Sequence, residues 1–158
     1  MDDSSAPDIV SAIEVAPQPL TDAPKKIKIG AVARYFGVSV DLLRLYEREG
    51  LLIPLKSPKG TRYFTELDYP WIATVLRLVR EARMNFVGIR HLLALLPCWE
   101  IRGCGDSRKR ECNITAGASE PCWMLQTCCS PEECYGCAVY RAASQCENLR
   151  AFVANRPV

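Results

Sequence analysis

The sequence predicts a mainly α-helical protein made of two unlike parts, and three observations support this. Apolar side chains recur at helical spacing in four stretches between residues 25 and 97, and a short hairpin pattern separates the second stretch from the third. All nine cysteines lie after residue 97. The first 24 residues carry five acidic side chains and no Lys or Arg. We expect a disordered acidic tail at 1–24, a packed domain at 25–97 and a loop-rich cysteine segment at 98–158.

The packed domain begins with two short helices joined by a tight turn. The first helix has one apolar face and ends at Gly37; this face comprises Ile29, Val32, Ala33 and Phe36. Ser39 is expected to cap the second helix, Val40–Glu49, which ends at Gly50. The side chains that this helix turns inward are Leu42, Leu43 and Tyr46. Two helices in this order predict a helix-turn-helix.

A basic hairpin follows. The stretch LLIPLKSPKGTRYF is strand-like at both ends and has turn residues, SPKG, at 57–60. Lys56, Lys59 and Arg62 lie near its tip. The sequence therefore predicts a wing beside the helix-turn-helix.

Two further helices complete the domain. Thr65 and Asp68 have the spacing of a helix cap before the first, whose apolar side chains are Ile72, Val75, Leu76 and Val79. Asn85 can cap the second, whose apolar stripe is Ile89, Leu92, Leu93 and Leu96. We expect both helices to form the core.

Charge and composition narrow the function. Residues 25–97 carry 13 basic and six acidic side chains, which points to a polyanionic partner, nucleic acid first, with solvated helix faces as an equal alternative on charge alone. No apolar run reaches membrane-spanning length and the N-terminus lacks a basic leader, so we expect a cytoplasmic protein with reduced thiols. His91 is the sole histidine, and no phosphate loop or nucleophile motif occurs, so we do not expect an enzyme.

Four stretches in order, IGAVARYFGVS, LLRLYEREGLL, GTRYF and IRHLLALL, resemble the MerR family of winged helix-turn-helix transcription regulators. The resemblance covers residues 27–96. It implies that Val40–Glu49 enters the major groove of double-stranded DNA, that the wing grips flanking phosphate, and that the protein is a homodimer acting on RNA polymerase indirectly. The DNA-binding residues that we expect on this basis are Lys28, Arg34, Ser39, Arg44, Tyr46, Lys59 and Arg62.

Arg44 falls on the recognition-helix arginine of the family and Arg62 on the wing arginine, where a planar guanidinium can pair with phosphate or guanine. Tyr46 falls on an aromatic position and has core packing as an equal alternative. Leu45 and Thr61 replace tyrosines that are usual in the family, and Arg83 replaces a glycine, which predicts a different turn before Asn85. Pro97 interrupts the chain where the family's long dimerisation helix would start, so the usual means of dimerisation is in doubt.

The cysteine segment repeats one frame, CWEIRGC at 98–104 and CWMLQTC at 122–128. This doublet resembles the cysteine-rich two-CW segments, over residues 98–140. Thiolates select zinc or iron–sulfur clusters, and an odd number of cysteines argues against a closed disulfide framework. The expected metal ligands are Cys98, Cys104, Cys112, Cys122, Cys128, Cys134 and Cys137, with the roles of Cys129 and Cys146 unassigned.

Three details of this segment can be tested by structure. Ser130, Pro131 and Glu133 have the pattern of a helix start, which would place Cys134 and Cys137 on one helical face. Trp99 and Trp123 either shield a metal site or fill the hydrophobic core.

The sequence thus predicts a DNA-binding transcription regulator whose cysteine segment binds an iron–sulfur cluster or zinc and senses redox state or metal. The alternatives are a purely structural zinc site or partner-docking module on the same DNA-binding protein and, less favoured, a thiol-redox or electron-transfer protein.

Overall fold

The computed structural model describes residues 24–96, 98–103, 119–125 and 131–144. The predicted tail lies outside these residues, apart from Pro24. The elements in chain order are β1 (Ile27–Lys28), α1 (Ile29–Phe36), α2 (Val40–Arg48), β2 (Leu55–Lys56), β3 (Arg62–Phe64), the 3₁₀ turn η2 (Glu66–Asp68), α3 (Tyr69–Arg80), α4 (Phe86–Ala94), α5 (Cys98–Ile101), α7 (Cys122–Leu125), α8 (Pro131–Gly136) and α9 (Ala138–Ala143). The predicted mainly helical, winged helix-turn-helix fold is confirmed.

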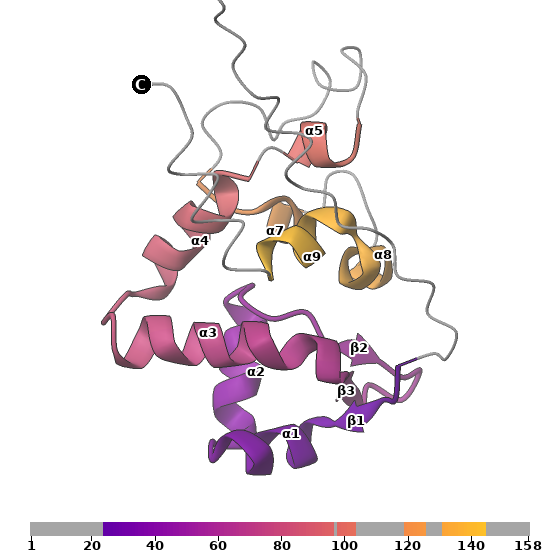
Figure 1. The fold of residues 1–158 in the computed structure, drawn as a ribbon. Coiled ribbons are helices and arrows are strands. Elements are labelled where there is room, and N and C mark those ends of the chain that lie inside the picture. Colours follow the sequence, from indigo (N-terminus) through magenta and orange to yellow (C-terminus); the bar gives the residue numbers. More distant parts are fainter. Residues whose placement is uncertain (1–23, 97, 104–118, 126–130, 145–158) are drawn as a thin grey trace, which may run out of the picture.

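The described elements gather at two opposite ends of the molecule (Figure 1). Helices α1 and α2 and the small sheet form one end, and α5, α7, α8 and α9 form the other. Helix α3 crosses between them, and α4 leads from one end to the other. Within the described part of the chain, no helix has the length and hydropathy needed to cross a bilayer.

The helix-turn-helix forms as its turn residues predict. Gly37 ends α1 in the left-handed conformation, φ 62°, and its N–H bonds back to the carbonyls of the last turn. The Ser39 side chain then accepts a hydrogen bond of 3.1 Å from the N–H of Leu42, which caps α2. The end of α1 and the start of α2 follow from these two local interactions, as predicted.

The wing is the hairpin of β2 and β3, closed by a turn in which Gly60 has φ 79°. A third strand, β1, pairs with β3 on its other side, with Ile27 opposite Phe64. Nothing in the sequence predicted β1, because a strand of two residues carries no alternating pattern. This strand ties the start of α1 to the base of the wing.

Helices α3 and α4 begin at their predicted caps. The Thr65 and Asp68 side chains form a capping box ahead of α3. The Asn85 side chain accepts a hydrogen bond of 2.7 Å from the N–H of Gly88 and caps α4. The buried side chains of the two helices are Trp71, Ile72, Val75, Leu76, Ile89 and Leu93, as their spacing predicts for most of them.

The turn between α3 and α4 differs from our expectation. Arg83 has φ 53°, the left-handed region in which glycine is favoured and other residues are strained. The backbone therefore keeps a conformation suited to glycine, and the prediction that this arginine imposes a different turn is wrong. The strain resides in Arg83 itself.

The cysteine segment packs onto the domain. Helix α8 begins at Pro131, as predicted, although Ser130 lies outside the described residues. Cys137 does not continue α8 but precedes α9, so the prediction that Cys134 and Cys137 share one helical face is wrong. Both parts contribute to one buried cluster, in which the side chains from the cysteine segment are Trp123, Cys134, Val139, Tyr140 and Ala143.

Candidate nucleic-acid interface and thiol cluster

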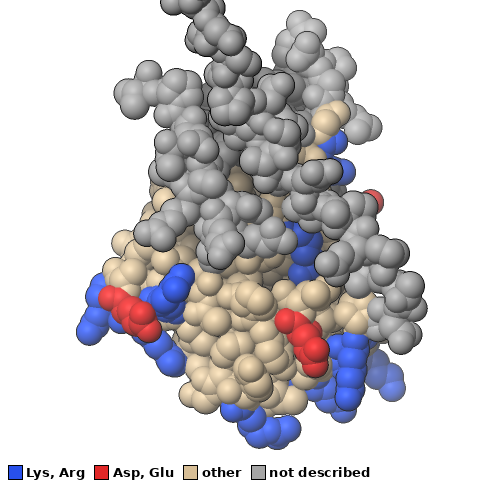
Figure 2. Space-filling view, in the orientation of Figure 1, with Lys and Arg blue, Asp and Glu red and all other residues tan. Residues whose placement is uncertain are grey.

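The end of the molecule that carries α1, α2 and the wing is rich in Lys and Arg side chains (Figure 2). The predicted DNA-binding residues that lie exposed there are Lys28, Arg34, Ser39, Arg44 and Lys59. Arg44 forms an ion pair of 3.1 Å with Asp41, and both side chains are largely exposed. Such a surface pair contributes little and is easily exchanged for a phosphate. The Arg44 guanidinium is therefore accessible to DNA.

Tyr46 is a correction to the predicted site. Its side chain is only 1% exposed, and its ring packs edge-on against Phe86 with centroids 5.8 Å apart. Burial raises the pKa of its hydroxyl, although the positive charge of Arg80 acts in the opposite direction. Of the two roles left open for Tyr46, the structure supports core packing, so it is removed from the DNA-binding set.

The wing is fastened to α2 by Glu47, a residue that sequence reasoning missed. Its carboxylate accepts a hydrogen bond from Arg62 and pairs with Lys56 at 2.8 Å. Burial opposes ionisation of Glu47, but hydrogen bonds from these two cations outweigh it and hold its pKa below the ordinary value. Arg62 thus positions the wing, and its guanidinium has further N–H donors that can meet phosphate.

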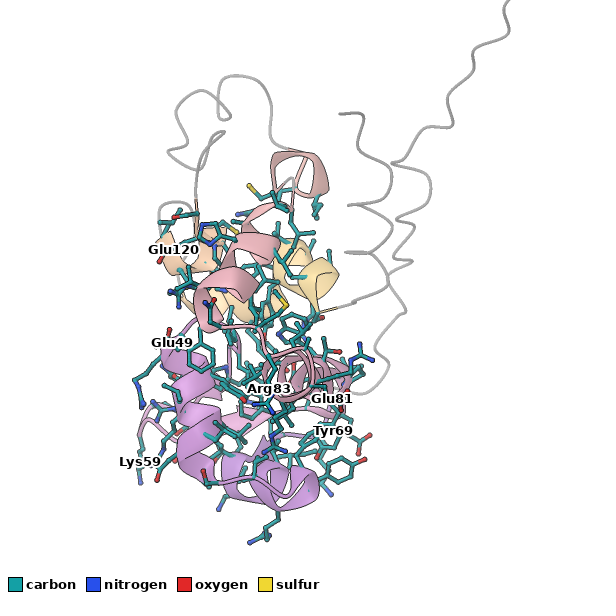
Figure 3. The ribbon with its side chains drawn as sticks, turned by 90° about the vertical axis from the view of Figure 1, so that its left-hand side faces the viewer. Glu49, Lys59, Tyr69, Glu81, Arg83 and Glu120 are labelled. Carbon is teal, nitrogen blue, oxygen red and sulfur yellow. The ribbon has the colours of Figure 1, made fainter. Side chains whose placement is uncertain are left out.

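A second acidic residue fastens the far end of α2. Arg90 of α4 forms an ion pair of 2.5 Å with Glu49 and lies 3.9 Å from Glu120, which precedes α7. In Figure 3, Glu49 lies at the end of α2 nearest the cysteine segment, with Glu120 beyond it. Arg90, Glu49 and Glu120 are far apart in sequence, so no local pattern could have indicated that they lie close together.

Residues 27–96 match the model of the MerR helix-turn-helix family of regulatory proteins. This stretch of the chain is a MerR-family domain. No curated protein and no solved structure matches the chain. The MerR domain supports DNA binding and regulation of transcription as the function of the chain.

Two tryptophans hold the connector that joins α2 of the MerR domain to the wing. Trp71 of α3 donates a hydrogen bond of 2.7 Å to the Leu51 carbonyl, and Trp123 of α7 donates one of 2.8 Å to the Gly50 carbonyl. Further along the connector, the N–H of Ile53 donates a hydrogen bond of 2.9 Å to the Tyr140 hydroxyl. The cysteine segment thus supplies two of these three contacts.

Gly50 also permits close packing at this point. It has φ 70°, and a Cβ placed on it would lie 2.2 Å from the Met124 sulfur. A residue with a side chain would have a strained backbone conformation here and would require the Met124 side chain to move. Trp123 is 7% exposed and packs edge-on against Tyr140, which agrees with the core-filling role. The side chain of Trp99 lies outside the described set.

A buried carboxylate joins the cysteine segment to the start of α3. Asp68 is 3% exposed and forms an ion pair of 2.9 Å with Arg141 of α9. It also accepts a hydrogen bond of 2.9 Å from the Tyr135 hydroxyl and one of 2.7 Å from the N–H of Thr65. The Arg141 guanidinium lies over the Tyr135 ring, 4.2 Å from its centroid. Asp68 therefore has two functions, the predicted cap and an unpredicted docking site.

Four of the seven predicted metal ligands are described, and they come together. The thiols of Cys98 and Cys122 share a hydrogen bond. That bond, burial, and the nearby charges of Cys98, Cys137 and Cys134 raise the pKa of Cys122. Each of the four carries a thiol rather than a disulfide, and all four belong to the shared core or pack against it. We refer to Cys98, Cys122, Cys134 and Cys137 as the thiol cluster.

The thiol cluster is not a finished coordination site. Among the described residues, no three His, Cys, Asp or Glu side chains form a ready-made site for a metal ion. The other predicted ligands lie outside the described residues; these are Cys104, Cys112 and Cys128. The described thiols of α5, α7 and the α8–α9 junction, up to 39 positions apart in the chain, thus influence one another without forming a complete ligand set.

Proposed function

We propose that the protein regulates transcription by placing α2 in the major groove and the wing on flanking phosphate, and that its cysteine segment holds a thiophilic metal whose presence is reported to the DNA-binding elements. The observation that carries this proposal is the pair of hydrogen bonds from Trp123 and Tyr140 to Gly50 and Ile53. These contacts lie on the connector between the recognition helix and the wing. A change in the cysteine segment therefore acts directly on the angle between the two DNA-contacting elements.

The donor chemistry of the thiol cluster suits either zinc or an iron–sulfur cluster. Both are held by sets of four thiolates, and a partly buried position protects such a site from water. When bound, the metal would supply cross-links among α5, α7 and the α8–α9 junction. These helices have four to six residues, too few to be stable alone. Trp123, Met124 and Tyr140 would then connect the ordering of these helices to the position of the connector.

We further propose that the regulator acts as a homodimer on paired half-sites and affects RNA polymerase through the geometry of the promoter DNA. Helix α4 ends at Ala94, and α5 begins at Cys98. The long helix usual in the family does not follow α4 within the described residues, so another surface would form the dimer.

The DNA-binding role is tested by Arg44→Ala. Removing this exposed guanidinium should weaken binding to an operator, selected from random duplex DNA, by at least about tenfold, because a good bidentate contact discriminates by about 1–3 kcal/mol. Fluorescence anisotropy measures the affinity and circular dichroism checks the fold. Arg77→Ala, an exposed arginine on α3, is the matched control. Unchanged affinity in Arg44→Ala would remove α2 as the recognition helix.

The metal is tested by anaerobic purification, an absorption spectrum and elemental analysis. Broad visible bands with bound iron identify an iron–sulfur cluster, and a colourless protein with bound zinc identifies zinc. Cys122→Ser should lower the bound metal and reduce the effect of metal on operator affinity more than it reduces affinity itself. Full metal content in this variant would exclude Cys122 as a ligand.

A purely structural metal is the second candidate, favoured by the single core that the two parts share. Under this alternative, metal removal unfolds the cysteine segment but gives no reversible change in operator affinity. Titrating metal back into the chelated protein while measuring that affinity separates the two.

A further inference from the structure

A cleft of about 380 Å³ lies between the connector and the cysteine segment. One wall is formed by the end of α2 and the chain up to β2, and the other by Trp123, Met124, Cys134 and Tyr135. This volume lies within the range of about 300–1,000 Å³ that is typical of sites for small molecules, which occur preferentially where two parts of a protein meet. The cleft shares Cys134 with the thiol cluster, but neither DNA contact nor metal binding requires an open space at this position.

The walls combine apolar surface with positive charge. Leu52, Ile53, Trp123 and Met124 supply apolar and aromatic surface. Arg48 and Lys56 also line the cleft, and both are exposed. The Glu47 carboxylate is shared between Lys56 and Arg62, so it neutralises only part of this charge. Glu47 also lines the cleft, but among the described residues neither it nor any other carboxylate forms an ion pair with Arg48, whose charge is therefore available to a ligand.

We propose that this cleft binds a small organic anion with a flat apolar body. The body would lie against Trp123 and Met124, and the anionic group would pair with Arg48 and Lys56. An apolar wall with a few polar groups at one end is the usual form of a site that fixes a ligand in one orientation. The site stands independently of any bound metal.

Occupation of the cleft would also affect DNA binding, and this consequence rests on the proposed DNA-binding role. Arg48 is in α2 and Lys56 is in the wing, so both belong to the elements that would meet phosphate. An anion bound to them competes with phosphate for the same cations. The ligand also bridges the connector and the cysteine segment, which would fix the position of one against the other.

The experiment uses 8-anilinonaphthalene-1-sulfonate as the probe and the full-length protein as purified. We expect saturable one-to-one binding, seen as a rise in fluorescence. Arg48→Gln should weaken it about tenfold, because a charge-assisted contact is lost. Arg77→Gln changes an arginine outside the cleft and should leave the probe affinity unchanged. The uncharged analogue N-phenyl-1-naphthylamine should bind more weakly than the sulfonate.

A second variant, Lys56→Gln, tests the same cation site in case Arg48→Gln does not fold. Near-ultraviolet circular dichroism checks the packing of both variants. Absence of saturable probe binding in the wild-type protein would overturn the proposal. Equal affinity in wild type and both glutamine variants would also overturn it, as would equal affinity for the charged and uncharged probes.

Discussion

The MerR domain and the cysteine segment reach order by different means. Helices in the MerR domain have eight to twelve residues, and three of them begin at side-chain caps or a capping box. The helices described in the cysteine segment, within residues 98–103, 119–125 and 131–144, have four to six residues. Helices this short are unstable alone in water, so their order depends on contacts with other groups. The cysteine segment is therefore organised by the surface on which it docks.

Docking is concentrated at two places on the MerR domain. One is the connector at Gly50 and Ile53, and the other is the Asp68 carboxylate. Both adjoin α2 or the wing, the proposed DNA-contacting elements, since the connector separates α2 from β2 and Asp68 caps the helix that follows the wing. A segment held at these positions cannot loosen without changing the support of the wing.

The largest expected effect comes from Asp68→Ala. It leaves Arg141 without its buried partner and removes the α3 cap, so we expect a loss of about 3–5 kcal/mol in the free energy of unfolding, measured with urea. Glu66→Ala, an exposed acid in the same turn, is the control and should change it by less than about 0.5 kcal/mol.

Arg141→Met sharpens this test, because it removes the docking contact and keeps the cap. It should release the cysteine segment to proteolysis while residues 27–96 remain resistant. A loss below about 1 kcal/mol in Asp68→Ala would mean that Asp68 does not hold the two regions together.

A smaller effect is expected from Gly50→Ala. The variant strains a left-handed backbone and pushes Met124 aside, which together should cost about 2–4 kcal/mol. Gly60→Ala has the same backbone strain at φ 79° with nothing within 4 Å of the added Cβ, and should cost about 1–2 kcal/mol. The difference, measured by thermal unfolding, isolates the contact with the cysteine segment. Equal losses in the two variants would show that Met124 does not pack on Gly50.

The smallest effect should be a gain. Arg83→Gly relieves the left-handed strain in the turn before α4 and should raise the free energy of unfolding by about 0.5–1 kcal/mol. The change lies within the MerR domain, so the docking of the cysteine segment should be unaffected. Arg83→Ala is the control and should bring no gain; a gain equal to that of glycine would attribute the effect to charge.

The sequence predicted the elements that local interactions determine. Ser39 and Asn85 were recognised as caps because each precedes an apolar helical stripe, and Gly37 because it follows one. The role of Tyr46 could not be predicted, since its position on α2 suits both DNA contact and core packing. Only the packing in the structure shows that it is a core residue. The β1 strand depends on its pairing with β3 and carries no pattern of its own.

For the candidate sites, the sequence predicted the types of residue involved but not their arrangement in space. Nine cysteines after residue 97 indicated a sulfur-rich site, but only the packing of α5, α7 and α8 shows that Cys98, Cys122, Cys134 and Cys137 converge. Glu47 with Arg62, and Asp68 with Arg141, join residues that are 15 and 73 positions apart. No periodicity reports such pairs, because they exist only after the chain has folded.

Amide hydrogen exchange of the connector tests the central claim most directly. The N–H of Ile53 donates to Tyr140, so its protection reports whether the cysteine segment is docked. We predict that Cys122→Ser, or chelation of metal from the wild-type protein, speeds exchange at residues 50–53 and leaves the Gly37 turn of the MerR domain unchanged. Equal protection of residues 50–53 in all three samples would contradict the account, because the thiol cluster would then have no influence on the DNA-contacting elements.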